Sequence, residues 1–499
     1  MSTDIPNKTR RKSFLDVGGP NSLNNFASSY TRAQSYIGST FLESPVHDAI
    51  SPNTSPSLLN TDEIVEIPPI PQGYNHIKTF TFPEADEETR LLLEGRTSAR
   101  GSVSSYHSGN STAPQTLFNA VNTLMGVGML SLPFGMKLAG WYCGTIIIIA
   151  TSMSCCFTVI ILGRIIKLHP HLKTYGDIAH AYGGPGFSYF VTCVFSVDLL
   201  GACLSLILLF ADSFINLVPG ISSAAFKTMV VSAVFILSFL PLSILSMISL
   251  CGIVCTFSII VVIAICGLIT HTTPGSLFVP EVTNLYPTNF NSLMLSLGLF
   301  MAPWGGHPIF PELYRDMRHP SKYSGCCKAS FATTFAFDYT IAVLGFLMFG
   351  IFCEDSIIKN LMTNENYPTW VNPLICIFMG LLPLTKLPLV TKPIITVFEN
   401  VMGIQTMSEK SFQKISARFA FFVFLLTVSL LFNSFGQVVS FLGSAICFTI
   451  CLIFPLLFYL HFFKEVSFHT RILIKTGIVL CIFGALLGTY ASLTMESTR

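Results

Sequence analysis

From Pro114 onwards the chain is a series of long apolar runs separated by short polar loops. A run of about 20 apolar residues is long enough for a helix to cross the hydrocarbon core of a bilayer. The pattern predicts about eleven spans, the split at Pro241 being the least distinct. Their predicted extents are 115–139, 141–166, 187–214, 224–242, 246–270, 291–313, 327–352, 370–398, 413–433, 435–460 and 471–494.

The composition agrees with this pattern. The chain is 51% hydrophobic and 11% charged, whereas soluble domains carry about 25% charged residues. We therefore predict an all-α polytopic membrane protein whose transmembrane domain occupies residues 114–495. The sequence contains no HExxH, GxSxG or nucleotide-binding loop, which argues against an enzyme or a primary pump. It also predicts no metal, cofactor or nucleic-acid partner.

Residues 1–110 have a different character. They are rich in Ser, Asn, Pro, Thr and Gly, without a sustained apolar period, and such a segment buries too little surface to offset its ordering entropy. We predict a disordered cytosolic tail. Ser13 follows three cations, and three other serines precede proline, a pattern that suits kinases; these are Ser44, Ser51 and Ser55. The run from Glu87 to Leu91 and Leu92 matches the acidic dileucine signal that sorting adaptors read.

The orientation follows from Lys and Arg in the loops. With the tail in the cytosol, the connections on that side carry most of the cations, among them Arg164, Lys173, Arg315, Lys414 and Arg471. Little beyond Lys137, Lys227, Lys359 and Arg499 falls on the other side. The odd span count then predicts a C-terminus in the lumen.

The first span is interrupted. It reads QTLFNAVNTLMGVGMLSLPFGMKLAGW from Gln115, with Gly126 and Gly128 ahead of Pro133. Glycine costs about 1 kcal/mol in a helix interior and proline removes a backbone donor. In a bilayer such a break is tolerated only against protein or a water-filled cavity. Either a substrate site or a kink with small-residue packing accounts for this segment.

The sixth span carries the same defect. Its centre reads APWGGHP from Ala302 to Pro308, with two prolines and two glycines in a short stretch. Two broken helices five spans apart indicate an inverted repeat of five plus five helices, with the site where the breaks meet. An odd shift also reverses the membrane direction, as inversion requires. The repeat favours a transport site over kinked packing.

Residues 114–495 resemble the amino acid/auxin permease family, and in particular its fungal vacuolar amino-acid transporters. The motifs that carry the resemblance are GVGMLSLPFGMKLAGW (126–141), VDLLGACLSLILLFADS (197–213), PLSILSMISLCGI (241–253), PWGGHPIFPELYRDMRHP (303–320), LGFLMFG (344–350) and FLGSAICFTICLIFP (441–455). The resemblance implies a leucine-transporter-like repeat plus one C-terminal helix. It also implies movement of neutral amino acids across the vacuolar membrane, usually coupled to protons.

The breaks supply the candidate substrate-binding residues. Backbone amides at Gly126, Val127 and Gly128 are expected to face the substrate carboxylate. Carbonyls of the second break are expected to face the substrate amine; these belong to Ala302, Pro303, Trp304 and Gly305. A packing plug is an equal alternative for the Trp304 side chain.

Ionisable residues within the spans supply the coupling candidates. Lys386 stands in an apolar run, where it either couples transport to protons or extends to the interface. Asn122 and Thr385 are the candidates for the positions that form the ion site of sodium-coupled relatives. Asp198 and His307 are further candidates, each with a structural alternative, and Asp338 ranks below them.

The predicted function is therefore a secondary active transporter that exchanges neutral amino acids for protons across the membrane of a vacuole or similar organelle. Proton-coupled efflux uses the same residues and stays open at this stage. A non-transporting amino-acid receptor on the same fold, signalling through the tail, is the alternative from another class.

Overall fold

The computed structural model describes residues 25, 28–29, 31–32, 109–218, 220–404 and 411–494. The acidic dileucine motif (Glu87, Leu91 and Leu92) lies outside the described residues, as do the candidate kinase sites Ser13, Ser44, Ser51 and Ser55. Most of the segment 1–110 also lies outside them, so its disorder stays a prediction.

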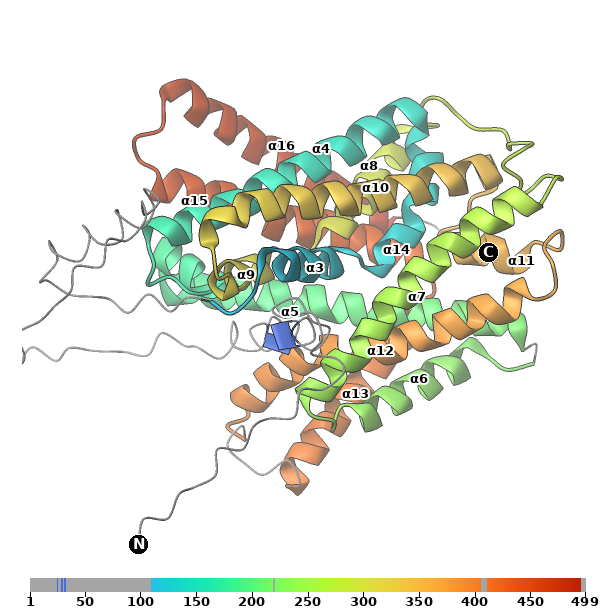
Figure 1. Cartoon of the computed structure of the whole chain (residues 1–499), viewed down its shortest axis with the longest axis horizontal. Helices are drawn as coiled ribbons and strands as arrows, with labels where there is room; N and C mark the ends of the chain where they lie inside the picture. The colour runs from blue at the N-terminus through green and yellow to red at the C-terminus, as the bar shows by residue number, and fades with distance from the viewer. Residues whose placement is uncertain are drawn as a thin grey trace, which may run out of the picture. The chain divides into compact units, whose positions relative to one another are not determined.

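The described chain is helical almost throughout (Figure 1). The α-helices are α3 (Ala113–Leu124), α4 (Leu132–Leu168), α5 (Tyr175–Leu217), α6 (Ser223–Leu237), α7 (Leu242–Ile269), α8 (Phe290–Met301), α9 (Phe310–Asp316), α10 (Tyr323–Phe349), α11 (Ile357–Thr363), α12 (Val371–Val401), α13 (Phe412–Leu431), α14 (Phe435–Phe441), α15 (Phe454–Phe462) and α16 (Phe468–Leu493). A π-helix, η8 (Leu442–Ile453), joins α14 to α15.

The helices match the predicted spans closely. Within the described residues, nine helical stretches are long and apolar enough to cross a membrane, and Ser223–Leu237 is a shorter apolar helix. Two features account for the difference from eleven. The fourth predicted span is the shorter helix Ser223–Leu237, and the first two predicted spans merge because the second half of the first continues into α4. Gly140 marks their boundary with φ 72°, and a Cβ there would lie 2.6 Å from Tyr286 N, so glycine is required. The predicted split at Pro241 is confirmed, since α6 ends at Leu237 and α7 begins at Leu242.

The two broken helices run antiparallel. At one end of the bundle, where α3 begins and α9 ends, the backbone amide of Ser111 donates to the Asp316 carbonyl at 2.7 Å. We call this the Ser111 end. At the opposite end the Trp141 amide donates to the Asn284 carbonyl at 3.2 Å, just before α8 begins. The predicted all-α membrane fold with interrupted first and sixth spans is confirmed, and the antiparallel pairing is the one that an inverted repeat requires.

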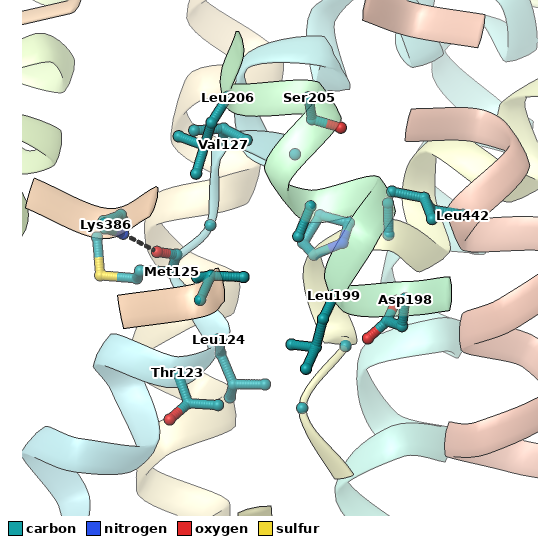
Figure 2. Close-up of a pocket in the computed structure, with 18 of the residues that line it drawn as sticks. Thr123, Leu124, Met125, Val127, Asp198, Leu199, Ser205, Leu206, Lys386 and Leu442 are labelled. Carbon is teal, nitrogen blue, oxygen red and sulfur yellow. Dashed lines mark hydrogen bonds between the residues drawn. The ribbon is translucent and has the colours of Figure 1, made fainter. Parts of the chain in front are cut away.

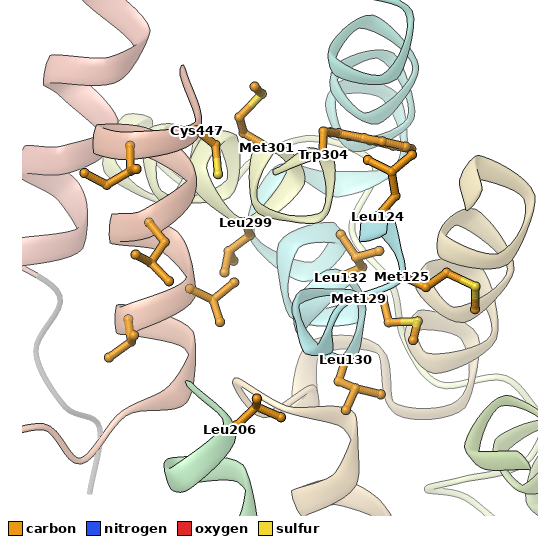
Figure 3. Close-up of a cluster of buried hydrophobic side chains, with 14 of the residues drawn as sticks. Leu124, Met125, Met129, Leu130, Leu132, Leu206, Leu299, Met301, Trp304 and Cys447 are labelled. Carbon is orange, nitrogen blue, oxygen red and sulfur yellow. The ribbon is translucent and has the colours of Figure 1, made fainter. Parts of the chain in front are cut away.

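Apolar side chains fill the space around both breaks (Figure 3). Leu124 and Leu130 come from the first broken helix, and Leu299 and Met301 come from the sixth; all four are buried. Outward faces are also apolar, as on α16, where Leu473, Leu480 and Leu486 are exposed. A protein with an apolar interior and an apolar exterior is suited to a lipid environment.

Helix α11 lies at the end of the bundle opposite Ser111 (Figure 1). Lys359 Nζ lies 3.0 Å from Asp212 Oδ2 on α5 and 2.8 Å from Asp355 Oδ1. Asp355 Oδ2 accepts hydrogen bonds from Ser434 Oγ at 3.1 Å and from the Gly436 amide at 3.0 Å. Burial lowers the pKa of Lys359, but the two carboxylates outweigh burial and raise that pKa. This charge cluster therefore ties α5, α11 and α14 together.

Candidate functional site

The first break replaces about one helical turn with irregular backbone. Helix α3 ends at Leu124, and Met125 follows with φ −71° and ψ 84°. Gly126 is extended, with φ −103° and ψ 179°, and a 3₁₀ turn, η3 (Val127–Ser131), leads into α4. The first amides of such a turn have no acceptor within it, and the last carbonyls of α3 lose their helical donors. Polar backbone groups without helical partners thus lie in the middle of a span, although the Gly126 amide donates to the Leu124 carbonyl at 2.8 Å.

The second break is longer. Helix α8 ends at Met301 and is followed by two short 3₁₀ turns, η4 (Ala302–Trp304) and η5 (His307–Ile309). Gly306 separates them with φ 126°, a conformation that other L-residues rarely adopt. Pro303, Pro308 and Pro311 supply no backbone donor, which explains why a regular helix does not resume before Phe310.

The two breaks touch each other. A Cβ built on Gly128 would lie 3.6 Å from the backbone nitrogen of Pro303, which is ordinary van der Waals contact. A Cβ built on Gly306 would lie only 2.7 Å from Thr123 Cγ2, so even alanine requires a shift there. These glycines allow the two broken helices to approach at the level of their irregular backbone.

A cavity of about 230 Å³ lies against both breaks (Figure 2). Most of its walls are apolar, from residues such as Leu199, Leu206 and Val439. The sequence-predicted residues that line it are Asn122, Gly126, Val127, Gly128, Asp198, Ala302, Pro303, Gly305 and Lys386. The structure therefore brings together most of the residues that sequence reasoning selected from four separate spans.

Lys386 caps the first break. Its Nζ donates a hydrogen bond of 2.8 Å to the Met125 carbonyl oxygen, at the C-terminal end of α3 (Figure 2). A cation at a helix C-terminus is stabilised by the partial negative charge of the last carbonyls. The described residues include no carboxylate in ion-pair contact with Lys386. Its stem lies against α7, where a Cβ on Gly252 would be 3.3 Å from Lys386 Cγ.

Asp198 provides the acidic group of the cavity. In Figure 2 it lies across the cavity from Lys386. The Cys447 thiol, on η8, is 4.0 Å from Asp198 Oδ1. No cation forms an ion pair with Asp198 within the described part of the chain. The cavity thus offers one carboxylate and one ammonium on different walls, with apolar surface between them.

Three sequence-predicted residues point elsewhere. The Trp304 indole is fully buried, donates from Nε1 to Thr151 Oγ1 at 3.1 Å and stacks on Phe331, a placement that suits the packing alternative. His307 Nε2 lies 2.9 Å from Thr158 Oγ1. Thr385 Oγ1 donates to the Leu382 carbonyl at 2.9 Å. None of the three is among the residues that line the cavity.

Sequence reasoning missed Thr151 and Thr158. Both lie on the buried face of α4, seven residues apart. Thr151 is hydrogen-bonded to Trp304 and Thr158 to His307, the two polar side chains of the second break. Two threonines at that spacing in an apolar helix form a polar stripe, which is the signal that could have identified them. Asp338 on α10 is buried away from the cavity lining, and neither of its carboxylate oxygens has a hydrogen-bond partner among the described residues.

Two broken helices that meet at a central cavity, within a bundle of apolar spans, define a membrane transporter. The family model described as transmembrane amino acid transporter protein matches residues 109–495. The chain belongs to this family, a family of transporters rather than enzymes.

Individual relatives agree with this membership. The chain is 28% identical to Amino acid transporter AVT1B of Arabidopsis thaliana over 431 residues, covering 82% of this chain and 76% of that protein. It is 25% identical to the Vesicular GABA transporter of Caenorhabditis elegans over 264 residues, covering 52% of this chain and 53% of that protein. Among solved structures, a manganese transporter of Eremococcus coleocola aligns with a TM-score of 0.45 at 11% identity, over 83% of this chain and 90% of the other.

Proposed function

We propose that this transporter exchanges neutral amino acids for protons across the membrane of a vacuole or lysosome-like organelle. The observation that carries the proposal is the Lys386 ammonium, which is 2.8 Å from the Met125 carbonyl at the first break. Sodium-coupled members of the wider group that the sequence resembles hold their ion near this break. At this point the Lys386 ammonium would take the place of the bound ion, as a cation that belongs to the protein.

The cavity suits a zwitterion with an apolar side chain. The amides of Val127 and Gly128 would receive the carboxylate, joined by that of Gly126 once its 2.8 Å hydrogen bond to the Leu124 carbonyl opens. The carbonyls of Ala302 and Gly305, with the Asp198 carboxylate nearby, would receive the ammonium group. The apolar walls would hold the side chain, which favours neutral over charged amino acids because a second charge would lack a partner.

Protonation of Lys386 provides the coupling step. The ammonium form holds the Met125 carbonyl and so caps α3 at the break. Loss of the proton removes the charge that strengthens this hydrogen bond and frees the first break to rearrange. Asn122, on α3, lines the same cavity and would assist the lysine there. Thr385 donates its hydroxyl to the Leu382 carbonyl of its own helix, and His307 is bonded to Thr158, so both are left with structural parts.

Charge and resemblance support the proposed direction and location. The Ser111 end carries Arg164, Lys173, Arg315 and Arg471, so this end faces the cytosol with the N-terminal segment, and α11 faces the lumen. The acidic dileucine motif and the resemblance to fungal vacuolar transporters favour an acidic organelle. There, exit of protons down their gradient drives amino acids inwards.

The test is uptake of labelled neutral amino acids into proteoliposomes containing the full chain. A pH difference that is acidic inside should produce accumulation, and collapse of the difference with a protonophore should release the accumulated label. Accumulation that follows a sodium gradient and ignores pH would contradict the proposal. Saturable binding without flux under any gradient would instead favour a receptor.

A further inference from the structure

A short piece of the N-terminal segment is attached to the first broken helix. Residues Asn25, Ser28, Ser29, Thr31 and Arg32 are helical, and the Ser29 side chain is completely buried. The Ser29 hydroxyl lies 2.6 Å from Ser111 Oγ and accepts a hydrogen bond of 2.9 Å from Asn119 Nδ2. Ser29 therefore contacts both the start of α3 and its second turn.

Arg32 extends the attachment to the sixth span. Its Nε lies 3.1 Å from Asp316 Oδ1 and 3.3 Å from Oδ2, and its Nη2 donates to Ser111 Oγ at 3.1 Å. Ser111 Oγ also donates to the Asp316 carboxylate, which ends α9. We call the five residues Ser29, Arg32, Ser111, Asn119 and Asp316 the clamp.

The clamp depends on Arg32. The Asp316 side chain is only 3% exposed, and Arg32 is the one cation that forms an ion pair with it in the described ranges. A buried carboxylate that loses its only cation is left with most of its desolvation penalty uncompensated. Asp316 therefore favours the state in which the N-terminal segment is bound.

The clamp lies one turn from the cavity. Thr123 Oγ1 donates to the Asn119 carbonyl at 2.9 Å, and Thr123 lines the cavity. Helices α3 and α9 are the halves of the two broken helices at the same end, and alternating access changes how such halves sit relative to their neighbours. A partner that joins them restrains this change.

We propose that the N-terminal piece carrying Ser29 and Arg32 docks on the Ser111 ends of α3 and α9, holds the two broken helices together, and must release before the Ser111 end can open. The surface formed by Ser111, Asn119 and Asp316 is thus a docking site for a segment of the same chain. The proposal rests on transport activity but not on the coupling ion or the substrate. It makes the N-terminal segment a brake on the transport cycle.

A reversible cross-link tests the docking. The two hydroxyl oxygens of Ser29 and Ser111 are 2.6 Å apart, so the double variant Ser29→Cys with Ser111→Cys places two thiols in contact. Mild oxidation of the full chain should form this disulfide, detected by mass spectrometry. Exchange of labelled amino acid at equal pH should then fall about tenfold or more and recover with a reductant.

The matched control moves one cysteine to the exposed neighbour, as Ser28→Cys with Ser111→Cys, which should neither cross-link nor lose activity on oxidation. The Ser111→Cys variant alone controls for native thiols, because Cys326 Sγ is 3.7 Å from the Ala113 carbonyl. Failure of the Ser29 pair to cross-link, or equal exchange in its oxidised and reduced forms, would overturn the proposal.

Removal of the cation tests the brake in the opposite direction. Arg32→Ala should raise the initial rate of exchange about three- to tenfold, because one charge-assisted contact with a buried carboxylate is lost. Arg32→Lys, which keeps a charge but not the fork, should fall between this variant and the native chain. An unchanged or slower rate for Arg32→Ala would refute the brake, and since exchange needs no proton gradient, this result is independent of the coupling mechanism.

Discussion

Lys386→Arg separates the charge of the lysine from its ability to release a proton. The native ammonium donates at 2.8 Å to the Met125 carbonyl. A guanidinium can supply a cation and a donor to the same carbonyl, but it stays protonated at any working pH. If Lys386 carries the proton, the variant should still bind substrate and exchange it, while it no longer converts a pH difference into accumulation.

The expected size follows from the driving force. One pH unit is worth about 1.4 kcal/mol per proton, so one-for-one exchange supports about tenfold accumulation for each unit of pH difference. With the Lys386→Arg variant, the ratio of substrate inside to substrate outside should stay at about one, which means that no gradient forms. Lys386→Ala loses the charge-assisted hydrogen bond as well, a loss of about 1.5–3 kcal/mol, and should also bind substrate about ten- to a hundredfold more weakly.

The assay compares two measurements on the same proteoliposomes. Counterflow of labelled amino acid at equal pH reports binding and exchange, and uptake under an imposed pH difference reports coupling. Lys392→Arg is the matched control on the same helix, since Lys392 Nζ lies 3.5 Å from the Ser238 carbonyl and away from the cavity lining. If Lys386→Arg accumulates substrate with the native pH profile, the lysine is not the proton carrier, and Asp198 becomes the next residue to replace.

Three further predictions test other parts of the molecule. Gly128→Val should weaken substrate binding about tenfold or more without loss of folded protein, whereas Gly128→Ala should have little effect. A Cβ at this position would lie 3.6 Å from Pro303 N, so only a branched side chain overpacks the contact. Normal binding by the valine variant in an equilibrium assay would disprove this. Lys359→Met should lower the free energy of unfolding by about 1–3 kcal/mol by leaving Asp212 and Asp355 without their cation. The pKa of Lys359 is raised in the folded state, so its contribution to stability is complete below the unfolded pKa and is lost only as pH rises through the higher folded pKa. The difference in thermal stability between the native chain and Lys359→Met should therefore be the same at pH 6 and pH 9. A difference that disappears at pH 9 would contradict this account. Replacing Leu91 and Leu92 with alanine should move the protein towards the cell surface while transport in vesicles persists, and an unchanged location by microscopy would exclude the dileucine motif.

The sequence was sufficient to predict the breaks because their cause is local. Glycine and proline act on the backbone that carries them, so Gly126, Gly128, Pro303 and Gly306 identify irregular segments without knowledge of the fold. Span counting worked for a similar reason, since a bilayer requires a minimum apolar length. The same local rules placed the boundary at Pro241, where α7 begins one residue later.

The direction of side chains was less accessible to sequence analysis. Trp304 and His307 lie in the second break, but whether each faces the cavity or α4 depends on Thr151 and Thr158, which are about 150 positions away in the sequence. The attachment of Arg32 to Asp316 depends on a contact between residues separated by 284 positions. Contacts of this kind arise from packing, and no periodicity within one span encodes them.

These contacts make the two breaks unequal. The second break is joined to α4 by the Trp304 indole, which donates to Thr151, and by a hydrogen bond between His307 and Thr158; the first of these involves no ionisable group. The first break is held instead by the ammonium of Lys386, whose strength as a donor depends on one proton. If Lys386 carries the coupling proton, loss of that proton would loosen the first break and leave the second attached to α4. On that proposal, α3 would be the element that moves when the proton is exchanged.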